Sequence, residues 1–115
     1  MNKPESTRQQ RVGSQIQKDI SDIFIKEGAA MVHGSMVSVT KVRMSPDLAL
    51  AKVFISVFPF ANAQDILARV KDGATTLRYE LGRRIGKQVR IVPELAFYVD
   101  DSLEYIENLD RLIKK

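Results

Sequence analysis

The sequence predicts an α+β fold in which three strands form one sheet and the helices pack against it. Apolar residues recur every three or four positions in four segments, which is the helical period. Three other segments are rich in β-branched residues, and a short turn joins the first two of them. Helices kept apart from a hairpin favour a layered α+β fold over a βαβ series. We expect one domain covering residues 1–115.

The first expected helix follows a short N-terminal segment, residues 1–6, that we expect to be flexible. Ser6 or Thr7 is the expected N-cap, and Gly28 suits the C′ position at the end of the helix. Its apolar stripe comprises Val12, Ile16, Ile20, Ile23 and Phe24. These spacings of three and four residues give the helix one buried face.

Two strands of a hairpin are expected at residues 35–44 and 48–60. Their connection, SPDL at residues 45–48, has the chemistry of a turn because Pro46 presets φ and Asp47 can accept hydrogen bonds from the nearby backbone. In the second strand Ala51, Val53, Ile55 and Val57 alternate with Lys52, Phe54, Ser56 and Phe58. A short turn makes the pair antiparallel, and Pro59 ends the second strand.

Two helices then precede a third strand and a last helix. The first covers residues 62–73, with Asn62 as its expected N-cap and a break at Gly73; the second covers residues 74–86. The third strand is expected at residues 88–100, where Pro93 indicates an edge position or a bulge. A right-handed crossover would make the second and third strands parallel neighbours. Residues 101–115 are expected to form the C-terminal helix.

Composition excludes several classes of function. Cysteine is absent and His33 is the one histidine, so we expect no metal and no cofactor. A hydrolase or nuclease would have to use His33 and scattered carboxylates such as Asp100. No apolar run is long enough to span a bilayer or serve as a signal peptide, so we expect a cytoplasmic protein without membrane contact.

Positive charge is concentrated in the helix and loop that precede the third strand. There Arg78, Arg83, Arg84, Lys87 and Arg90 stand against a single carboxylate, Glu80. One interpretation is a solvated helix face with Glu80 in ion pairs at helical spacing. The other is a platform for the phosphates of a nucleic acid, which fixed arginines bind with release of counterions. The net charge of +4 permits either interpretation.

The predicted order of elements is that of a type II KH domain, an RNA-binding fold. Four stretches, RQQRVGSQIQKDISDIF, VTKVRMSPDLALAKVFISV, LRYELGRRI and VPELAFYVDDS, together resemble the ribosome-binding factor A family. Members of this family are bacterial assembly factors of the small ribosomal subunit. They replace the GXXG loop of other KH domains by a kink between the two central helices. The resemblance places this interhelical kink at Gly73, Ala74 and Thr75.

The resemblance implies a non-catalytic ribosome biogenesis factor. It would bind the immature small subunit and its ribosomal RNA, assist maturation of the RNA 5′ end, and act notably in the cold. A ribosome-associated GTPase would assist its release, and we expect a monomer. The family also binds through the first helix and the hairpin, which adds these RNA-binding candidates: Arg8, Arg11, Lys18, Lys41, Arg43 and Lys52.

Two further expectations concern surfaces. The first helix and the helix at residues 74–86 are expected to share one basic side, with the acidic C-terminal helix turned away from phosphate. The alternative to an RNA-binding domain is a protein-binding adaptor that makes no direct RNA contact. Its apolar contact would be a cluster of Phe54, Phe58 and Phe60.

Overall fold

The computed structural model describes residues 5–27 and 35–100, and these residues form an α+β fold of one helical layer and one sheet. In chain order its elements are α1 (Thr7–Glu27), β1 (Met36–Met44), β2 (Leu50–Phe58), a 3₁₀ turn (Phe60–Asn62), α3 (Ala63–Asp72), α4 (Ala74–Ile85) and β3 (Glu94–Val99). This is the predicted order. The expected helix end at Gly28, His33 and the C-terminal helix at residues 101–115 lie outside the described residues.

The three strands form a sheet in the order β1-β2-β3. β1 and β2 are antiparallel, with Met36 opposite Phe58 and Met44 opposite Ala51, and a bulge interrupts their register at Thr40. β2 and β3 are parallel, from the pair Leu50 and Glu94 onward. The predicted hairpin and the predicted parallel neighbours are both confirmed. β3 lies at one edge of the sheet.

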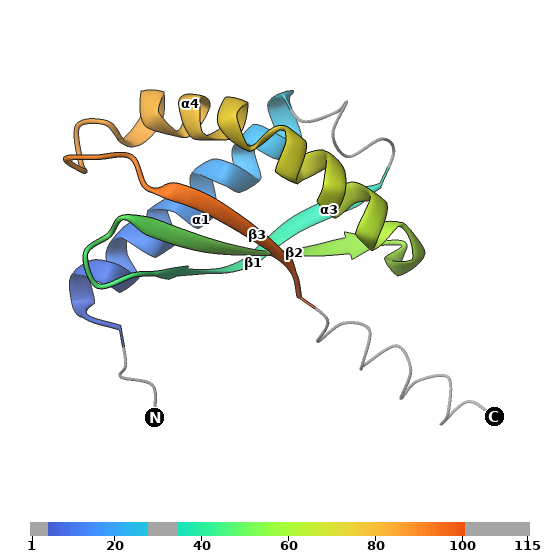
Figure 1. Ribbon diagram of the computed structural model, residues 1–115, viewed down its shortest axis with the longest axis horizontal. Coiled ribbons are helices and arrows are strands. Elements are labelled where there is room, and N and C mark those ends of the chain that lie inside the picture. The colour runs from blue at the N-terminus through green and yellow to red at the C-terminus, as the bar shows by residue number, and fades with distance from the viewer. Residues whose placement is uncertain (1–4, 28–34, 101–115) are drawn as a thin grey trace.

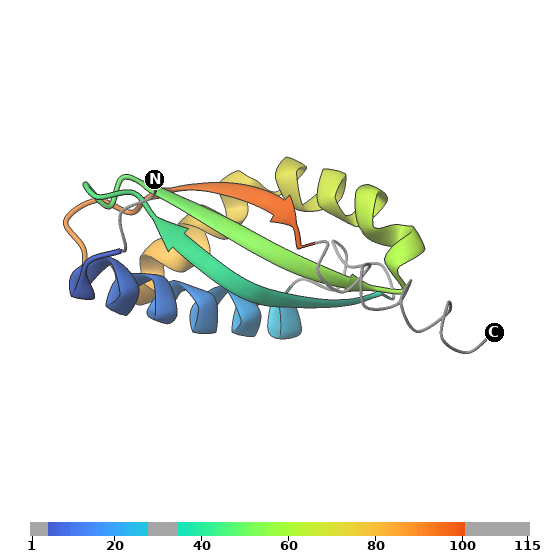
Figure 2. The same ribbon diagram turned by 90° about the horizontal axis from the view of Figure 1, so that it is seen from below.

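All three helices lie on one side of the sheet (Figure 1), and Figure 2 gives a view from below the sheet. The alternation predicted for β2 is confirmed, because Ala51, Val53, Ile55 and Val57 are all buried against the helices. Leu77, Leu81 and Ile85 of α4 and Ile16, Ile20, Ile23 and Phe24 of α1 belong to the same core. The opposite face of the sheet is therefore left without a helix from the described part of the chain.

The turn between β1 and β2 is held by its own polar side chains. Ser45 Oγ donates to Asp47 Oδ1 at 2.7 Å, and the same carboxylate oxygen accepts from the Ala49 N–H at 3.0 Å. These hydrogen bonds, that from Ser45 first, lower the pKa of Asp47. Leu48 takes a left-handed conformation with φ of 61°. The stretch SPDL thus shapes the turn, as its sequence predicts.

The start of α1 is anchored to the end of β1. Ser6 Oγ accepts from the Gln9 N–H at 3.1 Å and Gln9 Oε1 accepts from the Ser6 N–H at 2.7 Å, which is a capping box. Glu5 Oε2 accepts from the Met44 N–H at 2.8 Å. Ser6 is therefore the N-cap. Glu5 and Ser6 thus connect the start of α1 to the end of β1.

The sequence predicted two local details wrongly. Asn62 precedes α3 but does not cap it, because the 3₁₀ turn gives it helical dihedral angles and its amide instead donates to Ser35 Oγ at 3.0 Å. The third strand begins at Glu94 and not at residue 88, since Pro93 has no N–H for a sheet ladder. The break predicted at Gly73 is confirmed, because Gly73 separates α3 from α4 and Ala74 and Thr75 begin α4.

Candidate nucleic-acid interface

A groove runs between the outer side of α4 and the segment that leads into β3. We call it the α4 groove; it has a volume of about 600 Å³ and is lined by Thr75, Arg78, Tyr79, Gly82, Arg83 and Val92. A Cβ atom on Gly82 would lie 3.1 Å from Val92 Cγ2, so the glycine lets the segment approach the helix closely. The groove combines two guanidinium groups with an exposed aromatic ring.

Arg78 is fixed at the wall of the α4 groove by neutral acceptors. Its Nη2 donates to the Val92 carbonyl at 2.7 Å and its Nε donates to the Pro93 carbonyl at 3.1 Å. Two bonds from one planar group restrict the side chain to a narrow range of positions. Because carbonyl oxygens carry no net charge, the positive charge of Arg78 is held in place without being cancelled.

Arg83 also lines the groove from α4, and it has only a weak ion pair. Its Nη1 lies 3.6 Å from Glu80 Oε2, one helical turn away, and its side chain is 66% exposed. The predicted pairing of Glu80 at helical spacing is thus confirmed for Arg83. Exposed pairs of this kind contribute little to stability and open readily. Arg83 therefore remains available to an anionic partner.

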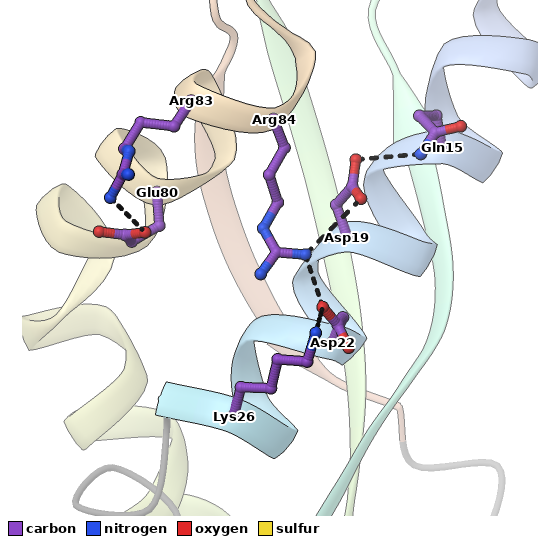
Figure 3. Close-up of polar contacts among 7 residues, drawn as sticks. All are labelled: Gln15, Asp19, Asp22, Lys26, Glu80, Arg83 and Arg84. Carbon is purple, nitrogen blue, oxygen red and sulfur yellow. Dashed lines mark hydrogen bonds and ion pairs between the residues drawn. The ribbon is translucent and has the colours of Figure 1, made fainter.

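Arg84 points towards α1, as Figure 3 shows, and it is not among the residues that line the groove. Its Nη1 lies 2.6 Å from Asp22 Oδ2 and 4.0 Å from Asp19 Oδ1, and its side chain is 29% exposed. Lys26 Nζ also lies 3.2 Å from Asp22 Oδ2. The hydrogen bond from Arg84, followed by that from Lys26, lowers the pKa of Asp22. Arg84 is thus an ionic bridge between α1 and α4, with its charge balanced inside the molecule.

Arg90 lies beyond the C-terminal end of α4, near the turn between β1 and β2. It lines a hollow of about 560 Å³ together with Arg8 of α1 and with Ser6, Pro46, Asp47, Leu48, Ala49, Val89 and Ile91. The structure thus brings together Arg8 from the first helix and Arg90 from the loop before the third strand, the two regions in which the sequence predicted RNA-binding cations. Lys87 is exposed in the turn between α4 and this hollow.

The remaining candidates lie on two other surfaces. Arg11 and Lys18 are exposed on α1, and Lys18 lines a shallow hollow with Ser14 and Ile25. Lys41, Arg43 and Lys52 are exposed on the face of the sheet opposite the helices, where Lys41 Nζ lies 4.7 Å from the centre of the Phe54 ring. The eleven cations therefore do not form one surface. α1 and α4 do pack together, but the predicted basic side shared by them is divided by the acidic pair Asp19 and Asp22.

The predicted phenylalanine cluster is also divided. Phe58 is exposed at the end of β2, Phe54 is half-buried on the open face of the sheet, and Phe60 packs against the core. One apolar patch formed by all three side chains is therefore absent from the described residues. The adaptor hypothesis loses the contact surface on which it was based.

Sequence reasoning missed the aromatic residue of the α4 groove. Tyr79 is 67% exposed and lies between Arg78 and Arg83 in the lining of the groove. The helical period could have indicated it, because Tyr79 falls on the side of α4 away from Leu77 and Leu81. The acidic partners of Arg84 had no comparable signal, since Asp22 precedes it by 62 residues.

Three observations on residues 5–27 and 35–100 concern metal ligands, Asp100 and membrane-spanning helices. No group of three His, Cys, Asp or Glu side chains in these ranges is placed to hold a metal ion. Asp100 Oδ2 accepts a hydrogen bond from Thr40 Oγ1 at 2.7 Å, which ties the end of β3 to β1. None of the helices in these ranges is long and apolar enough to cross a membrane.

Comparisons with known proteins identify the family. The family model for ribosome-binding factor A matches residues 8–113. The protein of that name from Cytophaga hutchinsonii is 43% identical over 111 residues, which cover 96% of this chain and 84% of the relative. The one from Flavobacterium psychrophilum is 41% identical over 112 residues, covering 95% of this chain and 85% of the relative.

Solved structures of the family share the fold. The crystal structure of ribosome-binding factor A from Thermus thermophilus aligns with a TM-score of 0.69 and 19% identity over 79% of this chain and 94% of that chain. Coordinates of the Thermus thermophilus factor fitted into a cryo-electron microscopy map of its complex with the 30S subunit align with a TM-score of 0.62 and 19% identity, over 81% and 96% of the chains. The fold is thus KH-like, and the chain belongs to the ribosome-binding factor A family.

Proposed function

We propose that the protein is a non-catalytic assembly factor of the small ribosomal subunit that holds ribosomal RNA against the α4 groove. One observation carries the proposal: the charge of Arg78 is fixed by two neutral carbonyls, at 2.7 and 3.1 Å, beside Tyr79 and Arg83. Folded RNA is bound mainly through phosphate, sugar and shape contacts. A fixed and uncancelled charge on a helix packed in the core suits this kind of recognition.

The family supports the choice of partner. A relative from Thermus thermophilus has been fitted into a map of its complex with the 30S subunit. We extend the proposal to the other roles that the resemblance implies, which are assistance in 5′-end maturation of the ribosomal RNA, importance in the cold, and release with help from a ribosome-associated GTPase. In this mechanism binding energy stabilises one conformation of the RNA, and no covalent step takes place on the protein.

Eight of the eleven candidate cations have a role in the proposed interface, and their roles are unequal. Arg78, Arg83 and Lys87 would contact phosphates along α4, and Arg8 and Arg90 would contact them at the hairpin end. Arg11 and Lys18 would add contacts if the RNA extends across α1. Arg84 would act indirectly, because its bridge to Asp22 fixes α4 relative to α1.

The test compares two double substitutions that remove the same charge. Arg83→Ala with Lys87→Ala removes two cations beside the α4 groove. The matched control, Arg69→Ala with Lys71→Ala, removes two exposed cations of α3, and Arg69 has an ion pair with Asp65 at helical spacing just as Arg83 has with Glu80. Affinity for purified immature small subunits is measured for the full chain at several salt concentrations, with thermal unfolding as the check on folding.

We expect the α4 substitutions to weaken binding and to reduce the slope of log affinity against log salt by roughly 0.7 to 0.9 for each lost phosphate contact. The α3 control should keep both the affinity and the slope of the unaltered protein. Equal loss from both variants would mean that only net charge matters. An unchanged slope in the α4 variant would exclude the groove, and binding that hardly depends on salt would favour the protein-binding adaptor.

A further inference from the structure

A cation and two aromatic rings form a row across the open face of the sheet. Lys41, Phe54 and Tyr98 come from β1, β2 and β3, and the register places Lys41 opposite Phe54 and Phe54 opposite Tyr98. The two rings stack with centroids 5.4 Å apart and planes inclined by 27°. The Lys41 ammonium lies 4.7 Å from the centre of the Phe54 ring. We call this set the aromatic row.

The next row of the sheet is basic. Arg43 of β1 and Lys52 of β2 lie directly opposite each other, and both are exposed. Like charges at opposite positions destabilise a strand pair, whereas opposite charges stabilise it. Folding stability alone therefore does not account for this pair. Within the described part of the chain, none of Lys41, Arg43 and Lys52 forms an ion pair, although Glu94 begins the neighbouring strand.

Tyr98 ends the aromatic row at the edge of the sheet. Its side chain is 43% exposed, and β3 has no further strand beside it among the described elements. Phe54 stacks on one face of the Tyr98 ring. The other face can therefore accept one more planar group as an extension of the stack. Exposed aromatic rings beside cations are typical of surfaces that bind single-stranded nucleic acid, because a base stacks while its phosphates meet Lys and Arg.

We propose that the open face of the sheet is a second RNA contact, where an unpaired base stacks on Tyr98 and its flanking phosphates bind Arg43 and Lys52. The inference rests on the proposed function for the nature of the partner, and it adds a surface opposite the α4 groove. A molecule with both surfaces would hold a folded RNA segment on its helical side and a single strand on its sheet side. It would thereby keep two parts of an immature RNA at a fixed separation.

The sequence makes a direct optical test possible, because it has no tryptophan and only three tyrosines, Tyr79, Tyr98 and Tyr105. In the full chain carrying Tyr79→Phe and Tyr105→Phe, Tyr98 is the single tyrosine fluorophore. We expect a short unstructured oligoadenylate to quench its fluorescence in a saturable way. An abasic strand with the same phosphates should quench it far less. Equal quenching by the two strands, or none by either, would overturn the stacking contact.

Affinity for the same oligoadenylate gives the second measurement. Tyr98→Ala should weaken binding by roughly 5- to 150-fold, the range expected for loss of one base stack, and Tyr98→Phe should retain it. Lys52→Ala should reduce the salt slope by about 0.7, while Lys71→Ala on α3 should leave it unchanged. Thermal unfolding checks that each variant is folded.

The outcomes separate this inference from the proposed function. If Tyr98→Ala binds the oligoadenylate as tightly as the unaltered protein, the sheet contact is wrong, whatever the Arg83 and Lys87 variant does to small-subunit binding. The same result is expected if a partner protein or residues 101–115 occupy this face instead of RNA. Loss of oligoadenylate binding with intact dependence on Arg83 and Lys87 would support both surfaces.

Discussion

Arg78 and Arg84 lie on the same helix, six residues apart, and their surroundings give them different roles. Arg78 donates to two carbonyl oxygens of the segment that enters β3. Arg84 lies against the carboxylates of Asp22 and Asp19 on α1. Both guanidinium groups are held in place, but only the charge of Arg84 is cancelled. The charge of the acceptor therefore decides whether a fixed arginine is available to bind a phosphate or instead stabilises the packing of the helices.

Figure 3 shows how local this distinction is, because Arg83 and Arg84 are neighbours in sequence and point to different partners. Arg83 turns to Glu80 on its own helix, while Arg84 crosses to Asp22, which also accepts from Lys26. Gln15 Nε2 donates to Asp19 Oδ2 at 3.1 Å and helps to orient that carboxylate. A run of two arginines thus divides into one binding candidate and one structural bridge.

The largest effect is expected from removing the fixed charge of Arg78. Arg78→Met should weaken binding to immature small subunits by about tenfold or more, the order of one hydrogen bond to a charged group. Arg78→Lys keeps the charge but loses the planar geometry that reaches both carbonyls. Its affinity should therefore lie between those of the unaltered protein and Arg78→Met.

Equilibrium binding at fixed salt measures this effect, and hydrogen exchange of residues 87–93 reports whether the segment stays in place. The comparison fails if Arg84→Met weakens binding as much as Arg78→Met while both proteins remain equally stable. In that case Arg84, whose charge is balanced by carboxylates, would contribute to RNA binding as much as Arg78.

A smaller effect, on stability, is expected from exchanging the charges of the bridge. Arg84→Glu would place a third carboxylate beside those of Asp19 and Asp22, so Tm should fall by a few degrees. Adding Asp22→Arg should restore part of the loss, because the pair is then reversed and not removed. Thermal unfolding of both single variants and the double variant measures the coupling. Purely additive changes would mean that the bridge contributes nothing to the packing of α1 on α4.

Local periodicity was enough to predict the fold, and it was not enough to assign the arginines. Leu77, Leu81 and Ile85 recur at helical spacing, and all three are buried, because a stripe of this kind can only face a core. The parallel pairing of β2 and β3 follows in the same general way from the long helical connection between them, because such a connection typically joins parallel strands. These rules act along the chain or hold for all chains, so they need no knowledge of particular contacts.

The errors come from contacts between distant segments. Asp22 meets Arg84 across 62 residues, and Arg78 meets the Val92 carbonyl because the loop before β3 folds back on α4. A carbonyl acceptor leaves no mark in the sequence, since every residue has one. The third strand begins later than predicted because Pro93 has no N–H for a sheet ladder, and the Val92 and Pro93 carbonyls accept from Arg78 instead.

The smallest expected effect concerns pH and isolates the bridge from the rest of the molecule. The hydrogen bond from Arg84 lowers the pKa of Asp22 below its ordinary value of 3.8. A carboxyl whose pKa is lower in the folded state adds stability above its unfolded pKa, and this is lost as pH falls through the folded pKa. The free energy of unfolding of the unaltered protein should therefore exceed that of the Asp22→Asn protein near pH 7, and the difference should shrink below about pH 4.

Chemical denaturation of both proteins between neutral and acidic pH measures this difference. Asp47 also has a lowered pKa, but it is present in both proteins, so its contribution cancels. An Arg84→Met protein provides the control, because Asp22 then loses the donor with the largest effect on its pKa but keeps Lys26, so the Asp22→Asn substitution should give a weaker dependence on pH. A difference between the unaltered protein and Asp22→Asn that stays constant down to strongly acidic pH would mean that Asp22 is not stabilised by the bridge. The distinction between Arg78 and Arg84 would then rest on geometry alone.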